Sequence, residues 1–175
     1  PGIERSPGGR LWATFYSGGK DEGPDNYVLL IKSDDDGVTW SEPILAIDPP
    51  DKIRAYDSCL WHDPSGRLWL FWAQSYEWYG GRCGVWTTVC DHPESDTLHW
   101  SEPRRIANGI MMNKPTVLST GEWLLPIAVW ASRQSELNRV DAERYSNVFV
   151  TTDEGQSFSL LGRADVPNRT FDEHM

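Results

Sequence analysis

Apolar residues along the chain gather in short runs of strand length, and polar turns separate them. The clearest runs, rich in aromatic and β-branched residues, cover residues 11–16, 27–32, 68–72, 84–89, 123–130 and 147–152. Gly, Pro, Asp and Asn lie between the runs, as expected for strands joined by turns. No long segment shows helical spacing, and residues 133–144, the best helical candidate, are interpreted as a polar loop. The pattern predicts an all-β protein.

A repeat of about 58 residues organises these strands. The sequence Gly-Arg-Leu-Trp at residues 9–12 returns at 66–69, and a looser copy, Gly-Glu-Trp-Leu, follows at 121–124. Trp-Ser-Glu-Pro at 40–43 likewise returns at 100–103. Several strands per repeat, with Trp and Gly at fixed places, are typical of β-propeller blades.

The repeat predicts how the chain is divided. We expect three blades and the start of a fourth, at about residues 1–50, 51–107, 108–166 and 167–175. The period is long for a four-stranded blade, so the excess is expected in loops at residues 17–26, 73–83 and 131–146. Loops on one face of a repeat array often build the binding site.

Composition and charge exclude several classes of function. The formal net charge is −10 and Lys and Arg form no cluster, so neither a nucleic-acid partner nor an anionic membrane surface is expected. No apolar run approaches the roughly 20 residues of a membrane span. Cys59, Cys83 and Cys90 lack metal-ligand spacing and are interpreted as buried apolar side chains, although one disulfide with one free thiol stays open.

Two eight-residue segments carry a more specific pattern. Residues 33–40 fit Ser-x-Asp-x-Gly-x-Thr-Trp, and residues 151–158 fit the same frame with conservative replacements, whereas the middle repeat keeps only Trp100. This pattern resembles the Asp-box of sialidases and related bacterial-neuraminidase-repeat proteins. In such a turn the Asp accepts hydrogen bonds from backbone N–H groups, the Gly takes a positive φ and the aromatic residue packs between blades. The structural positions are Ser33, Asp35, Gly37, Thr39, Trp40, Asp153, Gly155 and Phe158.

The resemblance implies a six-bladed β-propeller of the sialidase type, of which this chain forms about three blades. Three blades cannot close a ring, because each open end exposes a sheet face lined with Trp and Leu. Two arrangements stay open. The chain is part of a longer propeller, or it is a half that pairs with a second copy by two-fold symmetry.

Polar residues recur at one position of the repeat, ahead of the Gly-x-Leu mark. They are Asp57 in the second repeat, Asn113 and Lys114 in the third, and His174 at the start of the fourth. In a propeller these positions surround one axis, so we expect them to line one cavity for a carbohydrate ligand. His62 is a further candidate, for which a role in a turn is the competing interpretation.

The resemblance also implies catalytic roles. Sialidases use a Tyr nucleophile polarised by a Glu ahead of an inner strand, and Glu173 resembles that Glu. They use an acidic residue on the loop after the first inner strand as general acid and base. The loop at residues 16–26 matches that loop in place, which favours Asp21, with Glu22 as the alternative and Lys20 beside them. A solvated loop carboxylate is the competing interpretation for each acid.

The expected function is that of a sialidase-like glycoside hydrolase, exo-acting on a terminal acidic sugar, without a cofactor or a catalytic metal. The three arginines by which sialidases hold a carboxylate are not in place: the first would precede Pro1 and is off the chain or absent, and the other two would come from blades after Met175. Gly19-Lys20 also replaces the arginine that sialidases carry on the loop near the acid. A carbohydrate-binding propeller without catalysis and a polysaccharide lyase are therefore alternatives. A secreted or periplasmic location follows from the resemblance alone.

Overall fold

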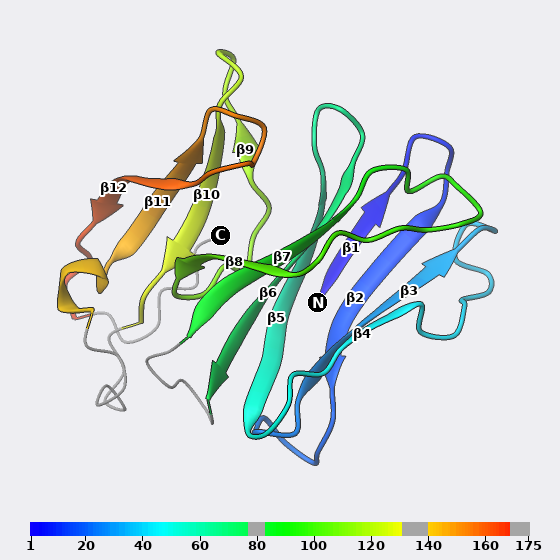
Figure 1. The fold of residues 1–175 in the computed structure, drawn as a ribbon, viewed down its shortest axis with the longest axis horizontal. Coiled ribbons are helices and arrows are strands. Elements are labelled where there is room, and N and C mark those ends of the chain that lie inside the picture. Colours follow the sequence, from blue (N-terminus) through cyan, green and yellow to red (C-terminus); the bar gives the residue numbers. More distant parts are fainter. Residues whose placement is uncertain (77–82, 131–139, 169–175) are drawn as a thin grey trace.

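Three antiparallel sheets of four strands each make up the protein in a computed structural model, which describes residues 1–76, 83–130 and 140–168. The sheets lie side by side in chain order, the first on the right and the third on the left of Figure 1. Within the residues so described, no helix is long and apolar enough to span a membrane. The all-β prediction is confirmed.

Each sheet follows the order of the chain, with every strand hydrogen-bonded to the next. The first sheet contains β1 (Gly2–Arg5), β2 (Leu11–Ser17), β3 (Tyr27–Ser33) and β4 (Leu45–Ile47). The second contains β5 (Ile53–His62), β6 (Leu68–Tyr76), β7 (Gly84–Cys90) and β8 (Arg104–Asn108). The third contains β9 (Thr116–Val117), β10 (Trp123–Ala128), β11 (Ser146–Thr151) and β12 (Ser159–Ala164).

The predicted strands are all present, with three corrections. Residues 73–76 continue β6 instead of entering a loop, since they pair with both β5 and β7. Asp57 lies inside β5, not ahead of its strand. Residues 141–143 of the expected polar loop form a short 3-10 helix, whereas residues 133–139 lie outside the described residues.

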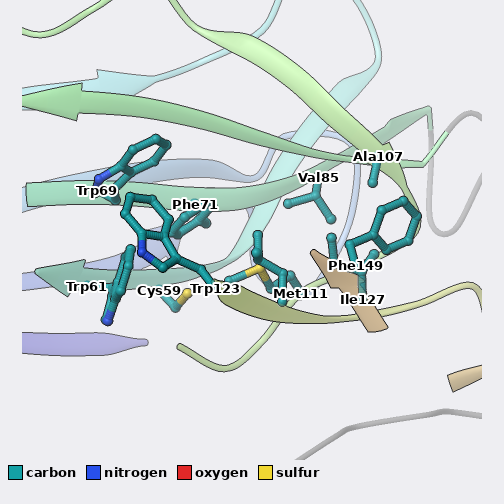
Figure 2. Packing of buried hydrophobic residues seen from close by; sticks show 11 residues of the cluster. Cys59, Trp61, Trp69, Phe71, Val85, Ala107, Met111, Trp123, Ile127 and Phe149 are labelled. Atoms are coloured by element: carbon teal, nitrogen blue, oxygen red, sulfur yellow. The ribbon is translucent and has the colours of Figure 1, made fainter. Parts of the chain in front are cut away.

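Two apolar layers hold neighbouring sheets together. Between the second and third sheets, the Trp123 ring stands edge-on to those of Trp61 and Trp69, with ring centres 4.8 and 5.6 Å away (Figure 2). Between the first and second sheets, Trp12 is wholly buried and stands edge-on to Trp100 at 6.5 Å. Most of the Trp residues that mark the repeat are therefore core residues. Their burial removes large apolar surfaces from water and so stabilises the contact between sheets.

The two segments that resemble the Asp-box, residues 33–40 and 151–158, form tight turns stabilised by their own side chains, and we call them the Asp-box turns. Asp35 Oδ1 accepts hydrogen bonds from Thr39 N and Ser33 Oγ, both at 2.8 Å. Asp153 Oδ1 accepts the corresponding bonds from Ser157 N at 2.9 Å and Thr151 Oγ1 at 2.7 Å. Gly37 and Gly155 take φ values of 84° and 82° in these turns, a conformation that glycine adopts at low cost.

The aromatic residues of these turns do not all pack between sheets. Phe158 packs against the apolar layer between the second and third sheets, with the Arg104 guanidinium 5.5 Å from its ring centre. Trp100 packs in the same way against the first sheet. Trp40 is instead 40% exposed, which corrects the expectation. The reason is its place in the first sheet: each of the other two aromatic residues packs on the preceding sheet, and Trp40 has no preceding sheet among the described residues.

An arginine in the Gly-Arg-Leu-Trp repeat ties the first sheet to a turn of the second, and its copy ties the second sheet to a turn of the third; we call this contact the arginine clasp. Arg10 Nη1 donates to the carbonyl oxygens of Pro93 and Ser95, both at 2.9 Å. Arg67 Nη2 donates to the carbonyl oxygen of Glu154 at 3.0 Å. The repeated sequence therefore encodes the contact between sheets as well as the strand that follows the arginine.

Candidate functional site

The loop at residues 18–26 is folded against the start of β5. The Asn26 side chain holds it closed by donating to the Gly18 carbonyl oxygen at 2.8 Å, and the Asn26 carbonyl accepts from Ala55 N of β5 at 2.9 Å. Gly18 has a φ of 97°, and a Cβ there would lie 2.0 Å from the carbonyl oxygen of Asp25. Glycine is therefore required for this closed loop, which brings its acidic residues to the junction of the first two sheets.

Three side chains from the two sheets meet at this junction. Tyr16 Oη, at the end of β2, donates to Glu22 Oε1 at 2.9 Å, and Arg54 Nη2 lies 3.8 Å from Glu22 Oε2. Burial raises the pKa of Tyr16 to about 12, and the hydrogen bond to Glu22 and its charge act in the same direction. Tyr16 therefore stays protonated as a donor to the carboxylate of Glu22.

Arg54 is the unusual member of the group. Its side chain is wholly buried, while that of Glu22 is 44% exposed. The guanidinium lies 3.8 Å from the ring centre of Tyr56, and none of its three nitrogens has a hydrogen-bond partner in the described part of the chain. Tyr56 is itself fixed, because its hydroxyl accepts from Ser75 Oγ and contacts Cys83 Sγ, both at 3.2 Å. We call Tyr16, Glu22, Arg54 and Tyr56 the Glu22 cluster.

Asp57 adjoins this cluster at an irregularity of β5. The register with β6 shifts between Tyr56 and Cys59, and Asp57 has a φ of 46°, which is uncommon for a residue with a side chain. Its negative charge contributes to the raised pKa of Tyr16, after burial and Glu22. Strained backbone of this kind tends to occur at functional sites.

The three predicted loop residues differ in their relation to the Glu22 cluster. Glu22 is part of it, whereas Asp21 and Lys20 are exposed on the same loop. The carboxylate of Asp21 makes no hydrogen bond within the described residues, while both oxygens of Glu22 face a partner. The loop follows β2, the second strand of its sheet, not the first strand as expected, because the short β1 precedes β2.

Lys114 and Asn113 have contacts that connect sheets. Lys114 Nζ forms an ion pair with Glu4 and donates to the carbonyl oxygen of Ile3 at 3.2 Å, and burial lowers its pKa. The Asn113 carbonyl accepts a weak bond from Cys59 Sγ at 3.7 Å. The segment before β9 is thus attached to β1 and β5.

His62 also takes part in a contact between sheets. Its Nε2 lies 3.0 Å from Ser6 Oγ, which accepts a hydrogen bond from Trp12 Nε1 at 2.8 Å. Its Nδ1 lies 3.3 Å from the carbonyl oxygen of Gly66. This chain of contacts joins the first sheet to the turn between β5 and β6, in accord with the role in a turn.

Other expected site residues are placed as follows. Glu173 and His174 lie outside the described residues. No group of three or more potential metal ligands occurs within residues 1–76, 83–130 and 140–168. Cys59, Cys83 and Cys90 are free and buried, so the alternative of a disulfide is wrong.

The sequence analysis missed Tyr16, Arg54 and Tyr56 as members of a site. One signal was present for Arg54, a charged residue within a strand whose neighbours are apolar or aromatic. A buried charge at such a place needs a partner or a function. The partner, Glu22, lies on a separate loop, and no spacing in the sequence relates the two.

Comparisons with known proteins agree with this fold. The sequence matches a family model described as a BNR repeat-like domain over residues 9–161. A search of curated proteins found no match.

Two solved structures show the relation in three dimensions. The Hadza microbial sialidase Hz136 superposes with a TM-score of 0.69 at 16% identity, over 94% of this chain and 37% of that one. A protein of unknown function from Dyadobacter fermentans DSM 18053 gives 0.57 at 13% identity, over 91% of this chain and 48% of that one. The chain thus spans less than half the length of either protein. It belongs to the family of BNR repeat-like domains, and its fold resembles that of a sialidase.

Proposed function

We propose that the protein is a sialidase-like glycoside hydrolase that removes a terminal acidic sugar, with its site at the loop of residues 18–26. The observation that carries the proposal is the meeting of Glu22, Tyr16 and Arg54 at the junction of two sheets, with a second carboxylate, Asp21, exposed beside them. The family and the fold support the same reaction class.

The two loop carboxylates have different roles in this proposal. Asp21 is the proton donor to the leaving oxygen, because its carboxylate is exposed and free of hydrogen bonds within the described residues. Glu22 holds the loop through Tyr16 and Arg54 before the sugar binds. Glu173 assists a Tyr nucleophile, as in sialidases, and the nucleophile is supplied by sheets that complete a six-bladed ring or by a second copy of the chain.

Among the expected sugar-binding residues, Asp57 is the best supported, because it adjoins the Glu22 cluster. Lys20, Asn113 and His174 remain further sugar-binding residues in the proposal. Lys114 and His62 are weaker candidates, since each already holds two sheets together.

The assignment of Asp21 is tested by leaving-group dependence. We expect Asp21→Asn in the intact protein to lower kcat by about 100-fold or more on a glycoside with an alkyl leaving group, which needs protonation. The loss is much smaller on a nitrophenyl glycoside, whose leaving group departs without an acid. Steady-state kinetics on such pairs of acidic-sugar glycosides give the comparison.

Asp25→Asn is the matched control, because Asp25 is an exposed carboxylate of the same loop. Equal kinetics for the two variants would remove Asp21 from catalysis. Binding of acidic sugars without turnover of any glycoside would favour the alternative of a carbohydrate-binding protein.

A further inference from the structure

We propose that Arg54 binds the carboxylate of the acidic sugar, and that Glu22 is an internal substitute which occupies this place until the ligand displaces it. The inference rests on the proposed function in naming a sugar as the ligand. It adds to that function a residue that binds the carboxylate of the sugar, and an exchange with Glu22 that controls access to that residue.

The first argument is the unsatisfied guanidinium. Arg54 is wholly buried, and its Nε, Nη1 and Nη2 have no hydrogen-bond partner among the described residues. Buried polar groups in proteins are nearly always hydrogen-bonded, and a buried charge without such bonds is costly. Glu22 Oε2, at 3.8 Å from Nη2, balances the charge but is too far for a hydrogen bond. A planar carboxylate that approaches more closely can accept two of these N–H groups at once.

The second argument is that Glu22 is the member of the cluster that can leave. Its side chain is 44% exposed, and Tyr16 Oη, at 2.9 Å, is its hydrogen-bond donor. Gly18 and Gly19 precede it in the loop, both with positive φ. A ligand arriving from solvent therefore meets Glu22 before it meets Arg54.

The third argument is charge. The Glu22 carboxylate already balances the charge of the Arg54 guanidinium. A ligand carboxylate that takes the place of Glu22 leaves this balance unchanged, whereas one that binds beside Glu22 adds a further like charge. Exchange is thus favoured over simple addition. The hydroxyl of Tyr16 is released in the exchange and can donate to the ligand instead.

The exchange is tested by binding measurements that need no turnover. Calorimetric titration of the intact protein with D-glucuronate and N-acetylneuraminate, each beside its methyl ester, isolates the contribution of the carboxylate. We expect the wild type to prefer at least one free acid over its ester. Arg54→Met should lower the affinity for that acid by about 10- to 100-fold, as for a lost hydrogen-bonded charge, and leave the affinity for the ester unchanged.

Glu22→Gln should change the affinity for the free acid in the opposite direction to Arg54→Met. A merely structural role of Glu22 does not predict such an increase. Removing the competing carboxylate should raise the affinity for the free acid several-fold, with little change for the ester. If Arg54→Met does not fold, Arg54→Lys keeps the charge, loses the planar pair of donors and should still weaken binding of the acid. Circular dichroism and thermal unfolding establish that each variant is folded.

The outcomes separate this inference from the proposed function. Unchanged affinity for the acids in the Arg54 variants, or an affinity in Glu22→Gln that does not rise, overturns the exchange even if glycosides are hydrolysed. An acid preference that depends on Arg54, without turnover of any glycoside, supports the exchange and overturns hydrolysis.

Discussion

Asp35 and Asp153 are the residues whose chemistry is read most directly from the structure. Each carboxylate accepts a side-chain hydroxyl and a backbone N–H four residues later, and these bonds lower the pKa of both groups to about 2. Both side chains are solvent-accessible turn residues whose hydrogen bonds are all local. The acidity of the two carboxyl groups therefore reflects the local hydrogen bonds that stabilise each turn.

These two residues contribute to the pH dependence of stability. The pKa of each is near 4 in the unfolded chain and about 2 in the folded one, so their contribution is present above pH 4 and is lost as the pH falls toward 2. We expect the free energy of unfolding in urea to fall between about pH 4 and about pH 2.5. The double variant Asp35→Asn and Asp153→Asn should lose less over this interval, and an equal loss would show that other groups are responsible.

At the scale of elements, the two Asp-box turns share a conformation but differ in surroundings. A Cβ on Gly155 would lie 2.5 Å from Cη2 of the buried Trp69 ring and 3.0 Å from Trp123. A Cβ on Gly37 would meet Leu11 at the ordinary distance of 3.5 Å. The turn of the third sheet is therefore inserted into the apolar layer, and that of the first sheet is not.

This difference predicts unequal costs for the same substitution. Gly37→Ala should destabilise the protein by about 1 to 2 kcal/mol, because alanine must adopt a left-handed conformation. Gly155→Ala carries the same cost and should add about 1 to 3 kcal/mol, because rigid rings must move to admit the methyl group. Chemical denaturation of the two variants measures the difference directly. Equal destabilisation would mean that the turn at Gly155 moves away from Trp69 without loss.

The sequence predicted elements well because their signals are local. The runs around Leu68 and Trp123 carry strand composition, and the Asp-box residues specify their own turn within eight positions. Much of the site depends on distant pairs, which leave no such signal. Glu22 was expected from its loop, but its contact with Arg54 depends on how β5 begins. The exposure of Trp40 could not be predicted either. The eight-residue sequence pattern is the same whether the aromatic residue of the turn packs on a neighbouring sheet or faces solvent.

At the scale of the whole molecule, the three sheets leave apolar groups on the outer faces of the first and third. Trp40 and Ile3 are 40% and 59% exposed on the first, and Leu160 and Leu161 are 45% and 59% exposed on the third. Such surfaces usually meet a partner. They support the proposal that further sheets or a second copy complete a ring.

Ring closure predicts the accessibility of Trp40. In the assembled protein we expect hydroxyl-radical footprinting to oxidise Trp40 no faster than Trp100, which packs on Trp12 within the described residues. The two residues hold equivalent places in the repeat, so Trp100 serves as an internal standard. Rapid oxidation of Trp40 relative to Trp100 would contradict the closed ring, because it would leave the outer face of the first sheet in water.

The arginine clasp has a consequence for how the chain folds as it is synthesised. Arg10 reaches its acceptors 83 and 85 residues later, and Arg67 reaches its acceptor 87 residues later. On the ribosome, each sheet can therefore form its own strands early but gains its last anchoring bonds only when the next sheet has emerged. Translation then imposes an order of assembly from the amino terminus, in which the second sheet secures the first and the third sheet secures the second.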